Sequence, residues 1–550
     1  MSAKTGKSLS RNTDLNPEQQ KTIRMRSVNP LQFLLSAIRM AIREQEPHFV
    51  MLPFMAQGHM IPMVDLARLL AERGLAITIL TTPHNAARFQ SVIGRAIGSG
   101  LNIHISHLKF PCSEVGLPDG CENFDMLPSI EDAMKFFTAM GMLKEQVEEM
   151  LRQLKPPPSC LIADMCFPWA TDVALKLQIP RILFNGMGCF SLLCMHMLAI
   201  CKDWEAITSD TECFVVPGLP DRFEITKAQL RGTPNDPDPD ARKFWDQIRE
   251  AEVEAFGTVV NSFEELEPEY IKEYMKAKGK RVWCVGPVSL CNKDYSDKSE
   301  RGNKASIAEH ECLKWLDSKE PGSVVYVCLG SLSRTAASQL IELGLALEAS
   351  NRPFIWVLRH ASEEFQTWLL EEKFEERIKN RGLLIRGWAP QVLILSHLSV
   401  GGFLTHCGWN STLEGITAGV PMITWPLFAE QIFNEKLIVN VIKTGIRAGV
   451  EEPVLFGQEE KAGVKVKNDE IKRVIERLMD GGEEGNERRK RAKEVGEMAK
   501  RAVEEGGSSY LNMTLFIEHV IAEQATCQGR TANHDNALVD HENNDILIVP

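Results

Sequence analysis

Apolar runs of strand length alternate with segments of helical periodicity along most of the chain. The first run, His48 to Phe54, precedes a segment in which apolar residues recur at helical spacing as far as Gly74. The same rhythm returns after Cys160 to Asp164 and again after Ser323 to Ser331. Strands that alternate with helices in this way indicate a parallel sheet. The pattern therefore predicts an α/β protein.

A charged segment without periodicity, residues 291–310, separates two such strand–helix halves. We interpret it as a linker between two Rossmann-like domains, residues 47–290 and residues 311–505. A last helix over residues 506–524 should end the fold and pack back on the first domain. Ligands of such sheets bind at the carboxyl ends of the strands, so we expect a site in the cleft between the two domains.

The two ends of the chain lie outside this pattern. Residues 1–46 form an extension that is polar up to Ser27 and then contains a basic, amphipathic stretch, Asn29 to Glu44. We expect the extension to be disordered, although its composition leaves a targeting segment or a mis-annotated start open. Residues 525–550 lack periodicity and are expected to form a flexible tail.

Composition excludes several classes of function. A hydrophobic content of 44% and a charged content of 25% are typical of a soluble globular protein. The net charge of −12 argues against nucleic acid or an anionic membrane as a partner. The 14 cysteines include no CxxC pair and no zinc-type spacing, and several lie in apolar runs, which is typical of a reducing compartment. The apolar run Ile182 to Cys201 is interrupted by Asn185, and we interpret it as a buried strand and a core helix.

The stretch from Trp388 to Gln431 carries the most specific chemistry. An apolar strand, Val400 to His406, breaks at Cys407-Gly408 into a helix that should begin around Trp409 to Ser411. The first turn of a helix has backbone N–H groups without partners, and the helix dipole favours negative charge there. Such a turn can hold a diphosphate. The spacing alone is equally compatible with an ordinary strand–helix–strand unit whose tryptophans are packing residues.

Side chains around this turn suit a nucleotide sugar. His406 and Ser411 can donate hydrogen bonds to a phosphate. Asn410 and Glu414 are four residues apart and share a helix face, where the carboxylate can accept from ribose hydroxyls. The end of the stretch, Glu430-Gln431, has side chains suited to sugar hydroxyls, and its opening residue, Trp388, could stack on a planar base.

From its opening Trp388 to its closing Gln431, this stretch resembles the 44-residue signature box of the plant family-1 UDP-glycosyltransferases. HCGWNS, the glutamate after it and the final Glu-Gln stand where that family has them, and the resemblance extends over roughly residues 47 to 524. It implies the GT-B fold, in which two Rossmann-like domains face each other across a cleft. It also implies a cytoplasmic, monomeric enzyme that needs no metal or other cofactor.

The implied reaction transfers glucose from UDP-glucose, with inversion, to a hydroxyl of a small hydrophobic acceptor. The likeness is to the branch of the family that acts on plant hormones, terpenoids, steroids and flavonoids in secondary metabolism. The sequence does not say which acceptor is used.

A histidine and an aspartate are the candidate catalytic residues. His59 follows a glycine at the end of the first strand, and an isolated histidine there is usually structural. In this chain it lies in Gly58-His59-Met60-Ile61-Pro62, which resembles the GHxxP pattern of the family, so the resemblance implies a general base. Asp164 ends a buried strand and could be a helix cap. The resemblance implies that it orients the His59 ring and stabilises the imidazolium.

The resemblance also assigns binding residues. Trp388 and Gln391 should contact uracil and ribose, and Trp409, Glu430 and Gln431 form the pattern associated with glucose. The UDP-sugar site as a whole is expected to comprise Ser331, Trp388, Ala389, Gln391, His406, Gly408, Trp409, Asn410, Ser411, Glu414, Glu430 and Gln431. The acceptor pocket is expected among apolar side chains that are equally plausible as core: Phe167, Met187, Phe190 and Met195.

Three alternatives come from other classes. Gly186-Met187-Gly188 could open the fingerprint of a nicotinamide-dependent oxidoreductase, but Ser191 occupies the place of the third glycine. A catalytically inactive homologue that only binds ligands is a second alternative. A lipid-directed transferase at a membrane surface is the third, and it would need the stretch from Asn29 to Glu44 for docking.

Overall fold

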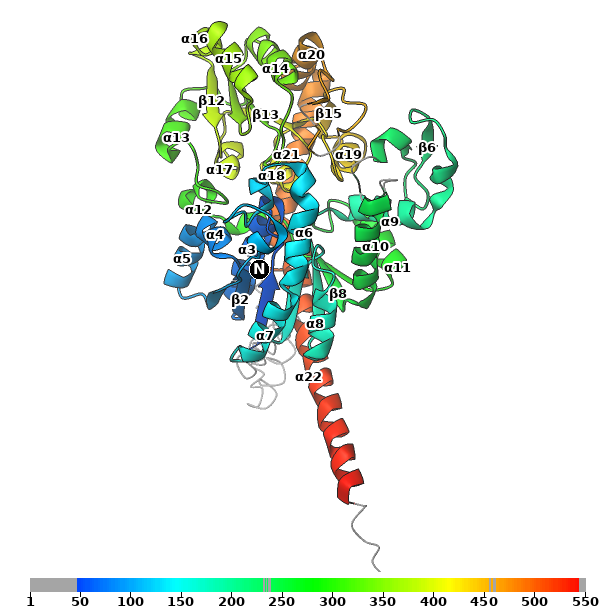
Figure 1. Cartoon of the computed structure of the whole chain (residues 1–550). Helices are drawn as coiled ribbons and strands as arrows, with labels where there is room; N and C mark the ends of the chain where they lie inside the picture. Colours follow the sequence, from blue (N-terminus) through cyan, green and yellow to red (C-terminus); the bar gives the residue numbers. More distant parts are fainter. Residues whose placement is uncertain are drawn as a thin grey trace, which may run out of the picture. The chain divides into compact units, whose positions relative to one another are not determined.

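The computed structural model describes residues 47–543, except 231–232, 234, 236–238, 455–456 and 459–460, and of residues 239–241 and 528–543 it describes the backbone alone. The predictions for residues 1–46 and for the last residues of the chain lie outside this range. Within it, two parallel sheets occupy separate halves, the first in blue to green and the second in green to yellow (Figure 1).

The first sheet has the strand order β3-β2-β1-β4-β5-β8-β9, and all its pairs are parallel. Its strands are β1 (His48–Leu52), β2 (Ala76–Thr81), β3 (Ile103–His107), β4 (Cys160–Asp164), β5 (Arg181–Asn185), β8 (Gly257–Val260) and β9 (Arg281–Cys284). A small antiparallel hairpin, β6 (Cys213–Val215) and β7 (Glu224–Thr226), stands apart from it. β1, β4 and β5 are buried along their whole length, which explains their nearly continuous apolar sequence.

The second sheet has the order β12-β11-β10-β13-β14-β15, again all parallel. Its strands are β10 (Val324–Cys328), β11 (Phe354–Leu358), β12 (Gly382–Arg386), β13 (Val400–Thr405), β14 (Met422–Thr424) and β15 (Gly445–Arg447). In each sheet the order of winding reverses between two central strands, β1 and β4 in the first and β10 and β13 in the second. This is the doubly wound, Rossmann-like arrangement, so the predicted fold class is confirmed.

Helices surround both sheets. Those of the first half are α3 (Gln57–Glu72), α4 (Pro83–Arg88), α5 (Gln90–Gly98), α6 (Ala133–Met142), α7 (Lys144–Gln153), α8 (Ala170–Lys176), α9 (Cys189–Ile200), α10 (Pro239–Glu254) and α11 (Pro268–Lys278). Short 3-10 turns occupy Ser113–Val115, Phe124–Met126, Ile130–Asp132, Lys202–Ala206, Lys227–Leu230 and Val288–Cys291.

The helices that follow are α12 (Tyr295–Ser299), α13 (Glu309–Asp317), α14 (Ala337–Ala349), α15 (Glu363–Glu371), α16 (Phe374–Ile378), α17 (Gln391–Leu395), α18 (Trp409–Thr417), α19 (Gln431–Lys436), α20 (Asn468–Met479), α21 (Glu483–Val503) and α22 (Ser508–Asn543). A π-helical turn, Leu437–Val441, extends α19. Among the described residues, no helix combines the length and the apolar character needed to span a membrane.

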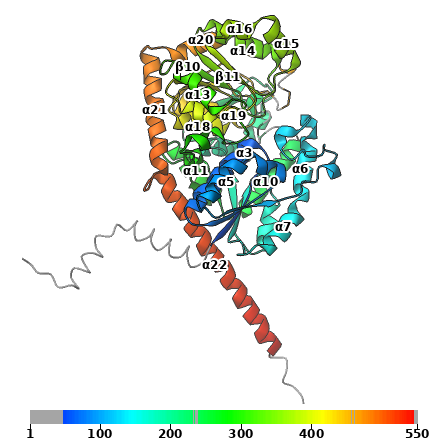
Figure 2. The ribbon, with the colours of Figure 1, turned by 90° about the vertical axis from the view of Figure 1, so that its left-hand side faces the viewer.

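The end of the chain returns to the first half. Figure 2 shows α21 alongside the second half and α22 continuing from it past the first. Phe516 of α22 packs on Trp283 and Phe49, with ring centroids 5.2 and 5.8 Å apart. The helix continues to Asn543, past the predicted end at residue 524. The extra length is physically reasonable, because residues 525–543 contain no proline and a single glycine.

Candidate active site

One cavity, open to solvent, is lined by residues that follow strand ends of both sheets. Every residue predicted for the UDP-sugar site except Gln431 lines it. His59 follows β1, and His406 follows β13, so the cavity lies where both sheets reverse their winding. This is the position at which doubly wound sheets bind their ligands.

His59 and Asp164 form a hydrogen-bonded pair at this cavity. The two residues are 105 positions apart in the sequence, but His59 comes after β1 and Asp164 ends the adjacent strand β4, and His59 Nδ1 lies 2.8 Å from Asp164 Oδ2. The Asp164 side chain is buried, and its Oδ1 accepts a hydrogen bond from the Cys166 amide at 3.0 Å. The His59 ring is 28% exposed and packs edge-on against Phe54. Since Nδ1 is engaged, Nε2 is the nitrogen that can serve a substrate in the cavity.

The surroundings of this pair raise the pKa of His59. Burial lowers the pKa of His59, but the charge of Asp164, the hydrogen bond to it and the charge of Glu430 outweigh burial, so the pKa lies above its usual 6.5. Glu430 lines the same cavity, and burial raises the pKa of its carboxyl. A base whose pKa is raised accepts a proton more readily, which suits general base catalysis near neutral pH.

The Cys166 thiol lies beside this pair, and the three side chains have the donor types of a metal site. Burial raises the pKa of Cys166 well above its usual value, and the charge of Asp164 adds to this. The thiol therefore stays protonated, and His59 Nδ1 and Asp164 Oδ2 already bind each other at 2.8 Å. Because metal binding requires a thiolate and free donor atoms, these residues fit the role of a catalytic pair better than that of a metal site.

Pro62 in the first turns of α3 explains a contact between the two halves. It has no N–H, so the carbonyl of Gly58, four residues earlier, lacks its usual helical donor. The side chain of Asn410 in α18 supplies the missing donor, with Nδ2 2.6 Å from the Gly58 carbonyl oxygen. The Gly58-to-Pro62 motif and the predicted diphosphate-binding turn are thus joined directly beside His59.

Trp409 provides a second connection. Its indole Nε1 donates to the carbonyl of Asn261 at 2.7 Å, and a Cβ at Gly188 would lie 2.6 Å from its ring. Gly188 is therefore required for close approach of the indole. This accounts for Gly188 without a dinucleotide, so the best motif of the oxidoreductase interpretation loses its support.

Two glycine turns enclose the ring of His406. A Cβ at Gly330, after β10, would lie 2.5 Å from His406 Nε2, and one at Gly408 would lie 2.4 Å from it. Burial lowers the pKa of His406 to about 4, so the ring is neutral at neutral pH. His406 Nδ1 has no hydrogen-bond partner among the described residues, although the ring lines the cavity. A neutral ring held this tightly can serve as a hydrogen-bonding group for a phosphate.

Substitution of Gly330 by Ala should disrupt this arrangement. The new Cβ would clash with His406, and the backbone of Gly330 has φ +89°, so we expect a loss of about 1–3 kcal/mol in stability together with weaker UDP binding. Thermal unfolding and UDP titration measure the two effects. Gly322→Ala is the matched control, because Gly322 has φ +68° and nothing within 4 Å of its would-be Cβ. Equal UDP affinity in the two variants would contradict the role assigned to the His406 turn.

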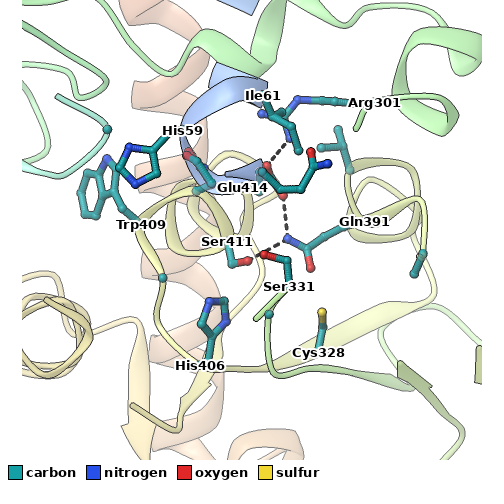
Figure 3. A pocket seen from close by; sticks show the side chains of 18 of the residues that line it. His59, Ile61, Arg301, Cys328, Ser331, Gln391, His406, Trp409, Ser411 and Glu414 are labelled. Carbon is teal, nitrogen blue, oxygen red and sulfur yellow. Dashed lines mark hydrogen bonds and ion pairs between the residues drawn. The ribbon is translucent and has the colours of Figure 1, made fainter. Parts of the chain in front are cut away.

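A hydrogen-bonded network fixes the floor of the predicted ribose site (Figure 3). Gln391 Nε2 donates to Glu414 Oε2 at 2.7 Å and to Ser411 Oγ at 3.0 Å. Gln391 Oε1 in turn lies 3.2 Å from the hydroxyl of Tyr326. The carboxylate of Glu414 is 95% buried from solvent but borders the cavity, as a group that binds hydroxyls should.

Some predicted residues are not brought to the cavity. Gln431 directs Oε1 to the backbone amides of Leu427 and Phe428, at 2.9 and 3.1 Å, and does not line the cavity. Of the four acceptor candidates, only Met187 lines it. The other three, Phe167, Phe190 and Met195, are buried in the core. Phe190, for example, packs against Phe223 and against Tyr270 of α11, because α9 lies against α11.

Sequence reasoning missed three cations in the lining: Lys298, Arg301 and Arg359. The guanidinium of Arg359 lies over the Trp388 ring, 5.0 Å from its centroid. Arg359 follows β11, and strand-end position was the signal that could have identified it. Lys298 and Arg301 lie in the charged segment interpreted as a linker, where no local pattern distinguishes them. These cations share the lining with two carboxylates, Glu414 and Glu430.

Several known proteins are similar to this chain. A family model described as "UDP-glucoronosyl and UDP-glucosyl transferase" matches residues 244–452. UDP-glycosyltransferase 73E1 of Stevia rebaudiana is 56% identical over 476 residues, which are 86% of this chain and 96% of that protein.

Solved structures are similar over the same range. The structure of Glycyrrhiza uralensis UGT73P12, complexed with glycyrrhetinic acid 3-O-monoglucuronide, has a TM-score of 0.83 at 38% identity and covers 90% of this chain and 100% of that chain. The structure of Phytolacca americana UGT2, complexed with UDP-2fluoro-glucose and pterostilbene, has a TM-score of 0.68 at 30% identity. It covers 87% of this chain and 100% of that chain.

Proposed function

Because the chain belongs to the plant family-1 UDP-glycosyltransferases, we propose that it transfers glucose from UDP-glucose to a hydroxyl of a small hydrophobic acceptor, with inversion. The observation that carries the proposal is the His59–Asp164 pair at the cavity that α18 also borders. A base for the acceptor and a helix start for the departing diphosphate therefore line one cavity. The proposed reaction requires no metal.

The proposed mechanism is a single displacement. His59 Nε2 takes the proton of the acceptor hydroxyl, and the hydroxyl oxygen forms a bond to the anomeric carbon of the sugar. The bond from that carbon to the β-phosphate oxygen breaks, and UDP leaves with the electron pair toward the first turn of α18. Asp164 stabilises the imidazolium that forms. His406, Ser411 and the helix start stabilise the negative charge on UDP.

The donor is proposed to be UDP-glucose. The pattern of Trp409, Glu430 and Gln431 supports glucose by resemblance, and the structure of Phytolacca americana UGT2 contains UDP-2fluoro-glucose. In this chain Gln431 would act by fixing the backbone at Leu427 and Phe428 rather than from the cavity wall.

Substitution of Gln431 by His tests the donor assignment. The imidazole cannot replace a carbonyl oxygen that accepts from two amides, so we expect kcat/KM for UDP-glucose to fall about 10-fold. The measurement compares kcat/KM for UDP-glucose with that for UDP-galactose in both proteins. Unchanged kinetics with both donors would remove Gln431 from the donor site.

The acceptor is proposed to be apolar, since Met165 and Met187 line the cavity and adapt readily to different shapes. Hormones, terpenoids and phenolics stay predictions, as does a cytoplasmic location. UDP release from UDP-glucose across a panel of such acceptors, with and without EDTA, tests the proposal. Turnover with at least one acceptor, insensitive to EDTA, is the expected result. UDP binding without turnover on any acceptor would favour the inactive, ligand-binding alternative.

A further inference from the structure

The segment that joins the two sheets is firmly attached to the first half. Arg68 of α3 donates to Asn292 Oδ1 at 2.7 Å and pairs with Asp297. Arg95 of α5 pairs with Asp297 as well, with Nη2 2.8 Å from Oδ1. These contacts hold α12 and the residues after it in one position, so the segment is not a loose tether. It brings Arg301 into the donor cavity.

Arg301 binds one carboxylate from each half. Its Nε lies 2.8 Å from Asp65 Oδ2 in α3, and its Nη1 pairs with Glu414 Oε1 in α18. The side chain is only 9% exposed. Burial lowers the pKa of Arg301, but the charges of Asp65 and Glu414 outweigh it and raise the pKa above its usual value. A permanent charge is therefore fixed beside the predicted ribose site, and Trp388 Nε1 donates to the Arg301 carbonyl at 3.2 Å.

Glu414 is held from two sides. Arg301 engages Oε1, and Gln391 Nε2 engages Oε2 at 2.7 Å (Figure 3). An ionised carboxylate offers about four acceptor positions, so two stay open for hydroxyls. An uncompensated carboxylate at this place would repel the diphosphate of a nucleotide sugar. The guanidinium offsets that charge at contact distance, where screening by solvent is weakest.

We propose that Arg301 is a positioning residue for donor binding: it orients the Glu414 carboxylate toward the ribose hydroxyls and compensates its charge beside the diphosphate. The inference rests on the proposed function, because it takes the ligand to be a uridine nucleotide. Asp65 contributes by fixing the guanidinium from α3, the helix that also carries His59. Ribose recognition thereby depends on contact between the two halves.

Calorimetric titration of the full chain with UDP, 2′-deoxy-UDP and 3′-deoxy-UDP tests the proposal. Wild type should bind at least one deoxy analogue about 10-fold or more weakly than UDP, since a hydrogen bond to a charged group is lost. Arg301→Met should bind UDP about 10-fold or more weakly than wild type, and its preference for UDP over the deoxy analogues should fall to about 2-fold. The deoxy penalty is the informative quantity, because a general loss of structure would not remove it selectively.

Arg377→Met is the matched control. It removes an arginine that also pairs with a carboxylate, that of Glu348, but that does not line the cavity, so affinity and deoxy penalty should match wild type. Arg301→Lys covers the case in which Arg301→Met does not fold, because a lysine keeps the charge but lacks the fork that reaches both carboxylates. It should show intermediate affinity and a reduced deoxy penalty.

A folded Arg301 variant with the wild-type deoxy penalty would overturn the inference and leave the proposed function standing. Tighter UDP binding by Arg301→Met would also overturn it, because Arg301 would then compete with ribose for Glu414. Absence of UDP binding by wild type would refute the proposed function and the inference together.

Discussion

Replacement of His59 by Ala should lower the rate of glycosyl transfer about 1000-fold, since general base catalysis contributes 10²- to 10⁴-fold. The loss should be in kcat, because His59 contacts the acceptor hydroxyl in the proposed mechanism rather than UDP. UDP affinity should stay within about 2-fold of wild type, which corresponds to less than about 0.5 kcal/mol. The measurements are UDP release with the best acceptor of the panel and UDP titration.

His310→Ala is the control for removal of a histidine as such. His310 is exposed on α13 and does not line the cavity. Its variant should have wild-type activity. Equal turnover by wild type and the His59 variant would reject the general base, whereas loss of UDP binding in the His59 variant would show a structural effect instead.

Substitution of Asp164 by Asn should lower kcat about 10²- to 10⁴-fold and also shift the pH profile. Burial lowers the pKa of His59, and the Asp164 charge is the first of the influences that raise it above 6.5. Without that charge the pKa falls, so a neutral His59 persists to lower pH. The acidic limb of kcat/KM should lie above pH 6.5 in wild type and at lower pH in the variant. A profile that keeps its position would show that Asp164 does not set the pKa of the base.

The His59–Asp164 pair should also make the stability of the fold depend on pH. A histidine whose pKa is higher in the folded state stabilises the fold fully below its unfolded pKa, near 6.5, and loses this contribution as pH rises through the folded pKa. The difference in thermal stability between wild type and the Asp164→Asn variant should therefore be largest at acidic pH, with wild type the more stable, and smaller at alkaline pH. Thermal unfolding over that range measures it. The opposite trend would mean that the two groups do not form an ion pair.

The candidate site was predictable to the extent that its residues follow strand ends or helix starts. His59, Asp164, Ser331 and the turn at His406 all do, and all take part in the site or line its cavity. Gln431 and three of the four acceptor candidates were chosen by position in a motif or by apolar character. Neither property says where a side chain points once its element is packed.

By itself the sequence determined the elements and the family. Apolar runs specify buried parallel strands, and the turn from His406 to Ser411 specifies a helix start. Both are local structures, so they depend on residues that are neighbours in the sequence. The tertiary structure alone decided which strand ends meet. The reversal of strand order places β1 beside β4, so that a histidine and an aspartate 105 residues apart come within 2.8 Å. The tertiary structure also placed Arg301 between Asp65 and Glu414. The charged segment that carries Arg301 shows no local sign of burial, because it becomes buried only through its contacts with both halves.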